Sequence, residues 1–325
     1  MAGTPDILLY HEEVSYYSFR VRMALAIKDL KYKKRRVNLF LSENLEPWYM
    51  RLNPSGLVPI LQHGETIVCD SDKILRYLDD AFPETIQLCP DESTNEGHMC
   101  DYFKRLSDKI DVHTITMIAP RFPEITKVKP RNPMFANAIH DQAPELCEKY
   151  ANDFPDLAEA YLAKKKLKLE ELLRLEDEEL VETAIHACED VMTKLEEELA
   201  RNDADMMQDK VQWLCGERFT SADIYWAATL YRLEEMGYDD RYWANGKRPH
   251  IEAYYEQIRS YDCFRKSEPS RCLLLMAKMR PHLPWVLAVG GAAVAAGVIY
   301  ALIKSRNGGK FPSIFAKEKI WVWTE

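Results

Sequence analysis

The sequence predicts an α+β fold followed by a membrane-spanning helix. Short apolar segments and two helix patterns alternate over residues 5–84, helical periodicity dominates residues 94–268, and residues 285–303 carry no charged side chain. Short apolar runs bounded by turn residues indicate strands, and apolar residues three and four apart indicate helices. A long uncharged apolar run indicates a membrane span.

Composition excludes several classes of partner and site. The 325 residues suffice for about two folded units of roughly 150 residues each. With 43 Lys and Arg against 52 Asp and Glu, the net charge is −9, so we expect no nucleic-acid partner. No two of the eight cysteines form a C-x-x-C pair, so we expect no metal site. The first residues lack a basic and apolar leader, which predicts cytosolic, reduced cysteines.

Residues 5–84 form the first predicted domain. In chain order we expect a strand at 6–10, a helix from Ser15, a strand at 33–39, a hairpin of 57–62 and 66–69, and a helix from Ser71 that ends before Pro83. Asp70 and Ser71 are residue types that cap a helix N-terminus. This order of strands and helices predicts a thioredoxin-like module.

Pro59 is the unusual residue of this module. Proline cannot donate a hydrogen bond to a strand ladder, so its place at the start of a paired stretch suggests a cis Val58–Pro59 bond. The run 51–61 (RLNPSGLVPIL), followed by Cys69, Asp70 and Ser71, resembles the glutathione-binding signature of the glutathione transferases.

That resemblance implies a glutathione site. It implies that glutathione, as substrate or ligand, pairs through its backbone with Val58 beside Pro59, and that Asp70 and Ser71 hold its γ-glutamyl group. It also implies that Ser15 is the catalytic residue, stabilising the glutathione thiolate near a helix N-terminus. Helix capping is the alternative interpretation of Asp70, Ser71 and Ser15. The sequence departs from the family at Leu57, where a polar or basic residue usually contacts a glutathione carboxylate.

Residues 94–268 form the second predicted domain, an all-α domain that carries an insertion at about 120–175. Five prolines predict a loop of about 30 residues from Pro120, and a long helical tract follows from Pro155. We expect the lysines at 164–168 to form a solvated helix face; binding to an acidic partner surface is the alternative. Thr220 and Asp223 predict a capping box, in a run that resembles the glutathione transferase helical domain.

The C-terminal region predicts a membrane anchor. Residues 285–303 would span about 28 Å as a helix, residues 270–282 form an amphipathic juxtamembrane segment, and residues 304–325 form a tail. Because the span emerges last in synthesis, we expect a tail anchor with the folded part in the cytosol. The short, moderately apolar span with basic flanks suits the outer mitochondrial or peroxisomal membrane. A buried core helix is the alternative.

The whole pattern resembles the ganglioside-induced differentiation-associated proteins. It rests on the insertion, the C-terminal span, and the runs 42–53, 63–65, 213–217 (WLCGE) and 245–249 (NGKRP). The resemblance implies a tail-anchored protein of the mitochondrial outer membrane, also of peroxisomes, that promotes organelle fission and affects glutathione-linked redox state.

Three functional hypotheses follow. The first is an adaptor or redox sensor whose glutathione pocket is degraded, as Leu57 and Tyr17 indicate, with fission or cytoskeletal proteins as partners and a homodimer as its assembly. The second is an active membrane-bound transferase that conjugates glutathione to an electrophile, and the third is a cytosolic transferase whose last helix is buried. Cys69, at the end of a strand, is expected to be a reduced thiol, with a mixed or intersubunit disulfide as the alternative.

Overall fold

The N-terminal module is built on a four-stranded mixed sheet in the computed structural model, which describes residues 6–132, 142–204 and 212–270. The strands are β1 (Ile7–His11), β2 (Lys33–Arg36), β3 (Ile60–His63) and β4 (Thr66–Cys69). They lie in the order β2-β1-β3-β4, with β1 parallel to β2 and the other two pairs antiparallel. This topology confirms the predicted thioredoxin-like module.

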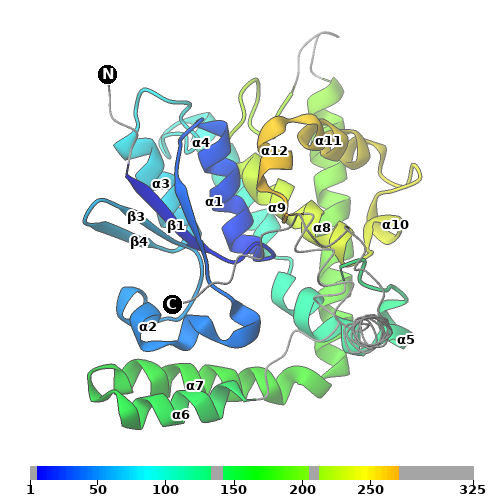
Figure 1. Ribbon diagram of the computed structural model, residues 1–325. Coiled ribbons are helices and arrows are strands. Elements are labelled where there is room, and N and C mark those ends of the chain that lie inside the picture. The colour runs from blue at the N-terminus through cyan, green and yellow to red at the C-terminus, as the bar shows by residue number, and fades with distance from the viewer. Residues whose placement is uncertain (1–5, 133–141, 205–211, 271–325) are drawn as a thin grey trace, which may run out of the picture. The chain divides into compact units, whose positions relative to one another are not determined.

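Helices cover both faces of this sheet. Successive residues of a strand point to opposite faces, so Tyr10 and Ile60 face α2 (Pro47–Leu52) and pack there with Tyr49. The opposite face carries α1 (Tyr16–Ile27) and α3 (Ser71–Ala81), which contact each other (Figure 1). Because β1 and β3 are antiparallel, the turn between β1 and α1 lies at the same end of the sheet as the residues that precede β3.

The helical domain is organised around α9 (Ser221–Glu235), which is buried along nearly its whole length and contacts α1 and α4 (Asn95–Asp108). Its first turn has the predicted capping box between Thr220 and Asp223. Outside the insertion, the described part of this domain also contains α8 (Glu178–Ala204), α10 (Asp239–Tyr242), α11 (Pro249–Ser260) and α12 (Asp262–Ser267), and the short helix α5 (Pro123–Thr126) lies at the start of the insertion.

The insertion is more helical than the sequence predicts. Part of the expected loop is α6 (Ala143–Asp153), in which Pro144 occupies the first turn, where proline costs no helical hydrogen bond. The expected long tract is two helices, α7 (Ala158–Leu173) and α8, separated by the short turn 174–177. Helices α6 and α7 lie side by side near α2 (Figure 1).

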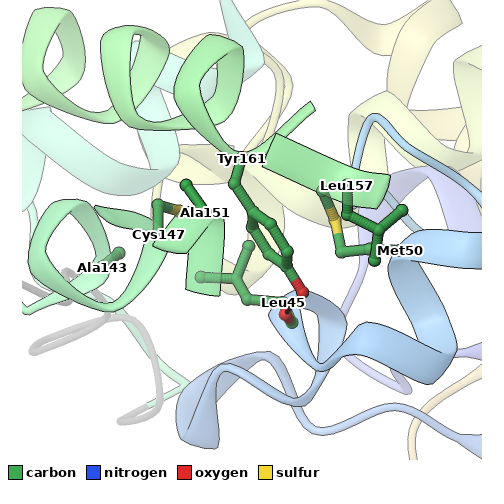
Figure 2. Packing of buried hydrophobic residues seen from close by; sticks show 7 residues of the cluster. All are labelled: Leu45, Met50, Ala143, Cys147, Ala151, Leu157 and Tyr161. Atoms are coloured by element: carbon green, nitrogen blue, oxygen red, sulfur yellow. Dashed lines mark hydrogen bonds between the residues drawn. The ribbon is translucent and has the colours of Figure 1, made fainter. Parts of the chain in front are cut away.

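A shared hydrophobic cluster joins the insertion to the N-terminal module (Figure 2). Its buried members are Leu45 and Met50 from the module and Ala143, Cys147, Ala151, Leu157 and Tyr161 from the insertion. The ring of Tyr161 lies between Ala151 and Leu157 with its hydroxyl directed toward Leu45, and none of its surface is exposed. The insertion is therefore part of the folded core.

The predicted membrane anchor at 285–303, the juxtamembrane segment beyond Ser270 and the tail at 304–325 lie outside the described residues. Within the described ranges, no helix has both the length and the apolar character needed to cross a bilayer.

Candidate functional site

A cavity of about 300 Å³ lies between the N-terminal module and the insertion. The module contributes residues 14–17 at the start of α1, residues 56–58, and five residues between β2 and α2: Leu39, Phe40, Ser42, Asn44 and Leu45. Helix α7 contributes Lys164, Lys168, Glu171 and Leu172. The remaining lining residues are Val112, His113, Thr116, Met117, Ala143 and Arg232. The segment that resembles the glutathione-binding signature and the insertion thus both line the cavity.

Ser15 lines this cavity and also caps α1. It is half-buried, and its Oγ accepts a 3.2 Å hydrogen bond from the Ser18 backbone N–H. The capping interpretation is therefore correct, and the hydroxyl hydrogen stays available to a ligand. The position also places a cavity ligand near the positive end of a helix dipole. The catalytic role of Ser15 stays a prediction.

Val58 lines the same cavity, and the Val58–Pro59 peptide bond is cis, as predicted. Among the described residues, no partner hydrogen-bonds the backbone N–H or carbonyl of Val58. The preceding carbonyl, of Leu57, accepts bonds from the Tyr49 hydroxyl at 2.7 Å and the Asn53 amide at 2.9 Å. The hydrogen bonds of Tyr49 and Asn53 thus fix the loop at Leu57, and the Val58 peptide groups stay available to a peptide-like ligand.

Asp70 and Ser71 follow β4, whose Cys69 pairs with Ile60, but they are not among the residues that line this cavity. Asp70 caps α3 with a positive φ of 80°, and its Oδ1 accepts hydrogen bonds from the backbone N–H groups of Asp72 and Lys73. Ser71 is the buried first residue of that helix. Neither residue lines the cavity that brings Ser15 and Val58 together. The capping role of Asp70 is shown, whereas a capping role for Ser71 and a γ-glutamyl role for both residues stay predictions.

Lys164 lines the cavity and is buried, although the sequence predicted that it would be exposed to solvent. It is 6% exposed, and its ammonium donates to the Ser55 carbonyl at 2.8 Å and weakly to the Gly56 carbonyl at 3.5 Å. The expectation of a solvated lysine face was therefore wrong at this position. Its spacing from buried Tyr161, three residues earlier on one helix face, is the signal that identifies it.

The charges beside Lys164 are largely paired with one another. Lys168 Nζ lies 2.5 Å from a Glu171 carboxylate oxygen, and His113 Nε2 lies 3.1 Å from the other. Burial alone would raise the pKa of Glu171, but the hydrogen bonds and charges of His113 and Lys168 outweigh it and lower that pKa to about 2. Burial, followed by the Lys168 charge, lowers the pKa of Lys164 to about 8.

Cys69 is half-buried at the end of β4, and its sulfur lies 3.7 Å from the Leu52 carbonyl oxygen. Burial raises the pKa of this thiol, which favours the unreactive protonated form. None of the cysteines in the described ranges forms a disulfide. Nor do those ranges contain a group of three or more His, Cys, Asp or Glu side chains that could hold a metal ion.

Solved structures share the fold of this chain. The beta-etherase LigF from Sphingobium sp. strain SYK-6 aligns with a TM-score of 0.59 at 20% identity, over 80% of this chain and 98% of that chain. Glutathione transferase F7 from Populus trichocarpa aligns with a TM-score of 0.52 at 19% identity, over 80% and 97%. At these identities the similarity shows the fold alone.

Family models divide the chain at the insertion. Residues 14–81 match the glutathione S-transferase N-terminal domain, and residues 178–257 match the glutathione S-transferase C-terminal domain. Helices α6 and α7 lie between the two matched ranges.

Similarity to curated proteins extends across the insertion. The chain is 30% identical over 269 residues to ganglioside-induced differentiation-associated protein 1-like 1 of Homo sapiens, covering 80% of this chain and 73% of that protein. The Mus musculus protein of the same name is 29% identical over 272 residues, with the same coverage. The chain therefore belongs to the ganglioside-induced differentiation-associated protein family, whose glutathione transferase-like fold it has.

Proposed function

We propose that this protein is a tail-anchored adaptor or redox sensor of the mitochondrial outer membrane, and of peroxisomes, which binds glutathione and promotes organelle fission. The uncharged span 285–303 and membership of the family support the anchor and the location. In this proposal glutathione acts as a ligand that reports redox state, and the folded part faces the cytosol.

The observation that carries this proposal is the shared wall of the cavity. Ser15 and Val58 come from the glutathione-transferase-like module, and Lys164 and Lys168 come from the insertion. A ligand in the cavity contacts both parts, so its binding free energy differs between conformations in which the insertion is docked or displaced. Binding of glutathione in the cavity can thereby change the position of the insertion, and with it a surface that a partner recognises.

A working transferase is the second candidate, and Ser15 supports it. Its hydroxyl lines the cavity at the N-terminus of α1, where a thiolate would be stabilised. Leu57 favours the adaptor because this exposed apolar side chain supplies no charge to a glutathione carboxylate. A charge-assisted hydrogen bond contributes about 1.5–3 kcal/mol, which is roughly tenfold or more in affinity, and the Leu57 side chain does not supply it.

Calorimetry and turnover separate these two candidates. Glutathione is titrated into the full chain in detergent micelles, and conjugation to a generic electrophile is then measured for the wild type and Ser15→Ala. The adaptor proposal expects binding without appreciable turnover, and equal binding in Ser15→Ala. Turnover that Ser15→Ala abolishes would establish the transferase, and absence of binding at millimolar glutathione would refute a glutathione sensor.

Location and fission need a separate experiment in cells. The full chain is compared with a chain in which Val294 and Ile299, inside the predicted span, are replaced by Lys. Central charges make membrane insertion unfavourable, so we expect the variant to leave mitochondria and to lose its effect on the organelle network. Mitochondrial retention of the variant would refute the anchor, and an unchanged network in cells with correctly placed wild type would refute fission.

A further inference from the structure

Three cationic side chains line the cavity, and they differ in whether a carboxylate neutralises them. Lys168 is paired with Glu171, and Arg232 Nε lies 3.6 Å from a Glu235 carboxylate oxygen. Lys164 has no carboxylate oxygen within 4 Å among the described residues, although it is 94% buried. A buried charge without a counter-ion is costly, so this ammonium is suited to an anionic ligand.

The hydrogen bonds of Lys164 leave capacity for that ligand. An ammonium has three donors, and the carbonyls of Ser55 and Gly56 accept one each, the second at the long distance of 3.5 Å. At least one donor, together with the full charge, stays available to a molecule in the cavity. The two carbonyls therefore aim the ammonium without neutralising it.

The position of the ammonium relative to Val58 matches a peptide-like ligand. Lys164 passes beside Gly56, where a Cβ atom would lie 3.5 Å from its Cε, and Gly56 precedes Val58 by two residues. A ligand paired antiparallel with Val58 runs its C-terminal residue past the residues that precede Val58. One further residue of extended chain advances by about 3.4 Å, so the ligand's terminal carboxylate falls beside residues 56–57.

We propose that Lys164 of the insertion binds the glycyl carboxylate of glutathione, at the place where Leu57 supplies no charge. This inference rests on the proposed function, in which glutathione occupies the cavity. The ligand would thus bridge the module and the insertion through an ion pair, and the insertion would complete a site that the N-terminal module leaves unfinished.

The rival interpretation is that Lys164 only fastens α7 to the loop at residues 55–56. Two ligands and three variants distinguish these roles. Glutathione and its glycyl monoethyl ester, which lacks that one negative charge, are titrated calorimetrically into the full chain in micelles. Lys164→Gln keeps a donor for the loop carbonyls and removes the charge, Lys164→Met removes both, and Lys166→Met on the exposed side of α7 is the matched control.

We expect the wild type and Lys166→Met to bind glutathione about tenfold more tightly than the ester. Lys164→Gln should bind both ligands equally, with the affinity that the wild type shows for the ester. Equal affinities of the wild type for the two ligands would overturn this inference while leaving glutathione binding intact. Equal weakening of both ligands in Lys164→Gln would assign Lys164 to fastening alone.

Absence of any binding of glutathione to the wild type would refute the proposed function and this inference together. That outcome is distinct from equal binding of glutathione and its ester, which would refute this inference alone. Thermal unfolding of each variant shows whether it is folded. The comparison of glutathione with its glycyl monoethyl ester on the wild type needs no substitution. It therefore tests whether the charge of the glycyl carboxylate contributes to binding even if Lys164→Met does not fold.

Discussion

The hydroxyl of Tyr161 in α7 donates a 2.8 Å hydrogen bond to the backbone carbonyl of Leu45, which lies 116 residues earlier in the chain. Both residues are buried in the cluster that joins the insertion to the N-terminal module (Figure 2). Burial raises the pKa of Tyr161 well above its usual value, so the hydroxyl remains a donor at physiological pH. The insertion is held to the module by a polar contact as well as by apolar packing.

Replacement of Tyr161 by Phe should destabilise the fold. The change leaves the Leu45 carbonyl buried without this partner, which costs about 1–3 kcal/mol. We expect the free energy of unfolding, measured by urea titration, to fall by that amount. Tyr150→Phe is the matched control, because within the described ranges the Tyr150 hydroxyl makes no hydrogen bond although its ring packs on Tyr161. Equal effects of the two substitutions would contradict the role of the Tyr161 hydroxyl.

The Lys28–Asp79 ion pair should be a strong determinant of stability. Lys28 Nζ lies 2.6 Å from Asp79, both side chains are buried, and the Asp79 carboxylate also accepts the backbone N–H groups of Leu88 and Cys89. Asp79→Asn leaves a buried lysine without its counter-ion, which costs about 3–5 kcal/mol. Thermal unfolding should show a clearly lowered midpoint for this variant. Exposed Asp80 provides the control, and Asp80→Asn should leave the midpoint nearly unchanged.

Ser15 should contribute to stability through its cap. Ser15→Ala removes the acceptor of the Ser18 N–H at the start of α1, which costs about 1 kcal/mol. Ser15→Thr keeps that acceptor and should retain most of the stability in urea titration. If Ser15→Ala were as stable as the wild type, the cap would contribute nothing to stability. Contact with a ligand in the cavity would then better explain a serine at this position.

Glutathione affinity should depend on pH through Lys164. Burial and the charge of Lys168 lower the pKa of Lys164 to about 8, so the cation is present below pH 8 and is lost as the pH rises through that value. Glu171 stays ionised throughout, because its pKa is about 2, and burial raises the pKa of the nearby Cys147 thiol on α6. We therefore expect affinity to fall by roughly tenfold between pH 7 and pH 9.

S-methylglutathione is the ligand for this measurement, because its blocked sulfur does not titrate. Calorimetry in the same buffers should show that Lys164→Gln lacks the additional loss of affinity above pH 8. Titration of the ligand amine affects both proteins equally, so the difference between them isolates Lys164. A parallel decline in the two proteins would assign the pH dependence to another group.

Several elements could be predicted because their causes are local. Asp70 and Thr220 cap helices with their own side chains, three or fewer residues from the N–H groups that they satisfy. The cis bond before Pro59 was predicted because proline is the residue type that permits it and because Pro59 stands in the run 51–61 that resembles the glutathione-binding signature. The loop expected around Pro144 was wrong for an equally local reason, since proline is favoured in the first turn of a helix.

The sequence by itself determined the thioredoxin-like order of strands and helices, the helical remainder and the caps, and its resemblance to the glutathione transferases assigned Ser15 and Val58 to one site. Only the tertiary structure decided that α6 and α7 dock on the module, that Asp70 and Ser71 lie outside the cavity, and that Lys164 lies inside it. Periodicity shows that a helix has faces but not what packs on them. Lys164 is a buried cation because the fold brings it to the Ser55 carbonyl, 109 residues away in the chain.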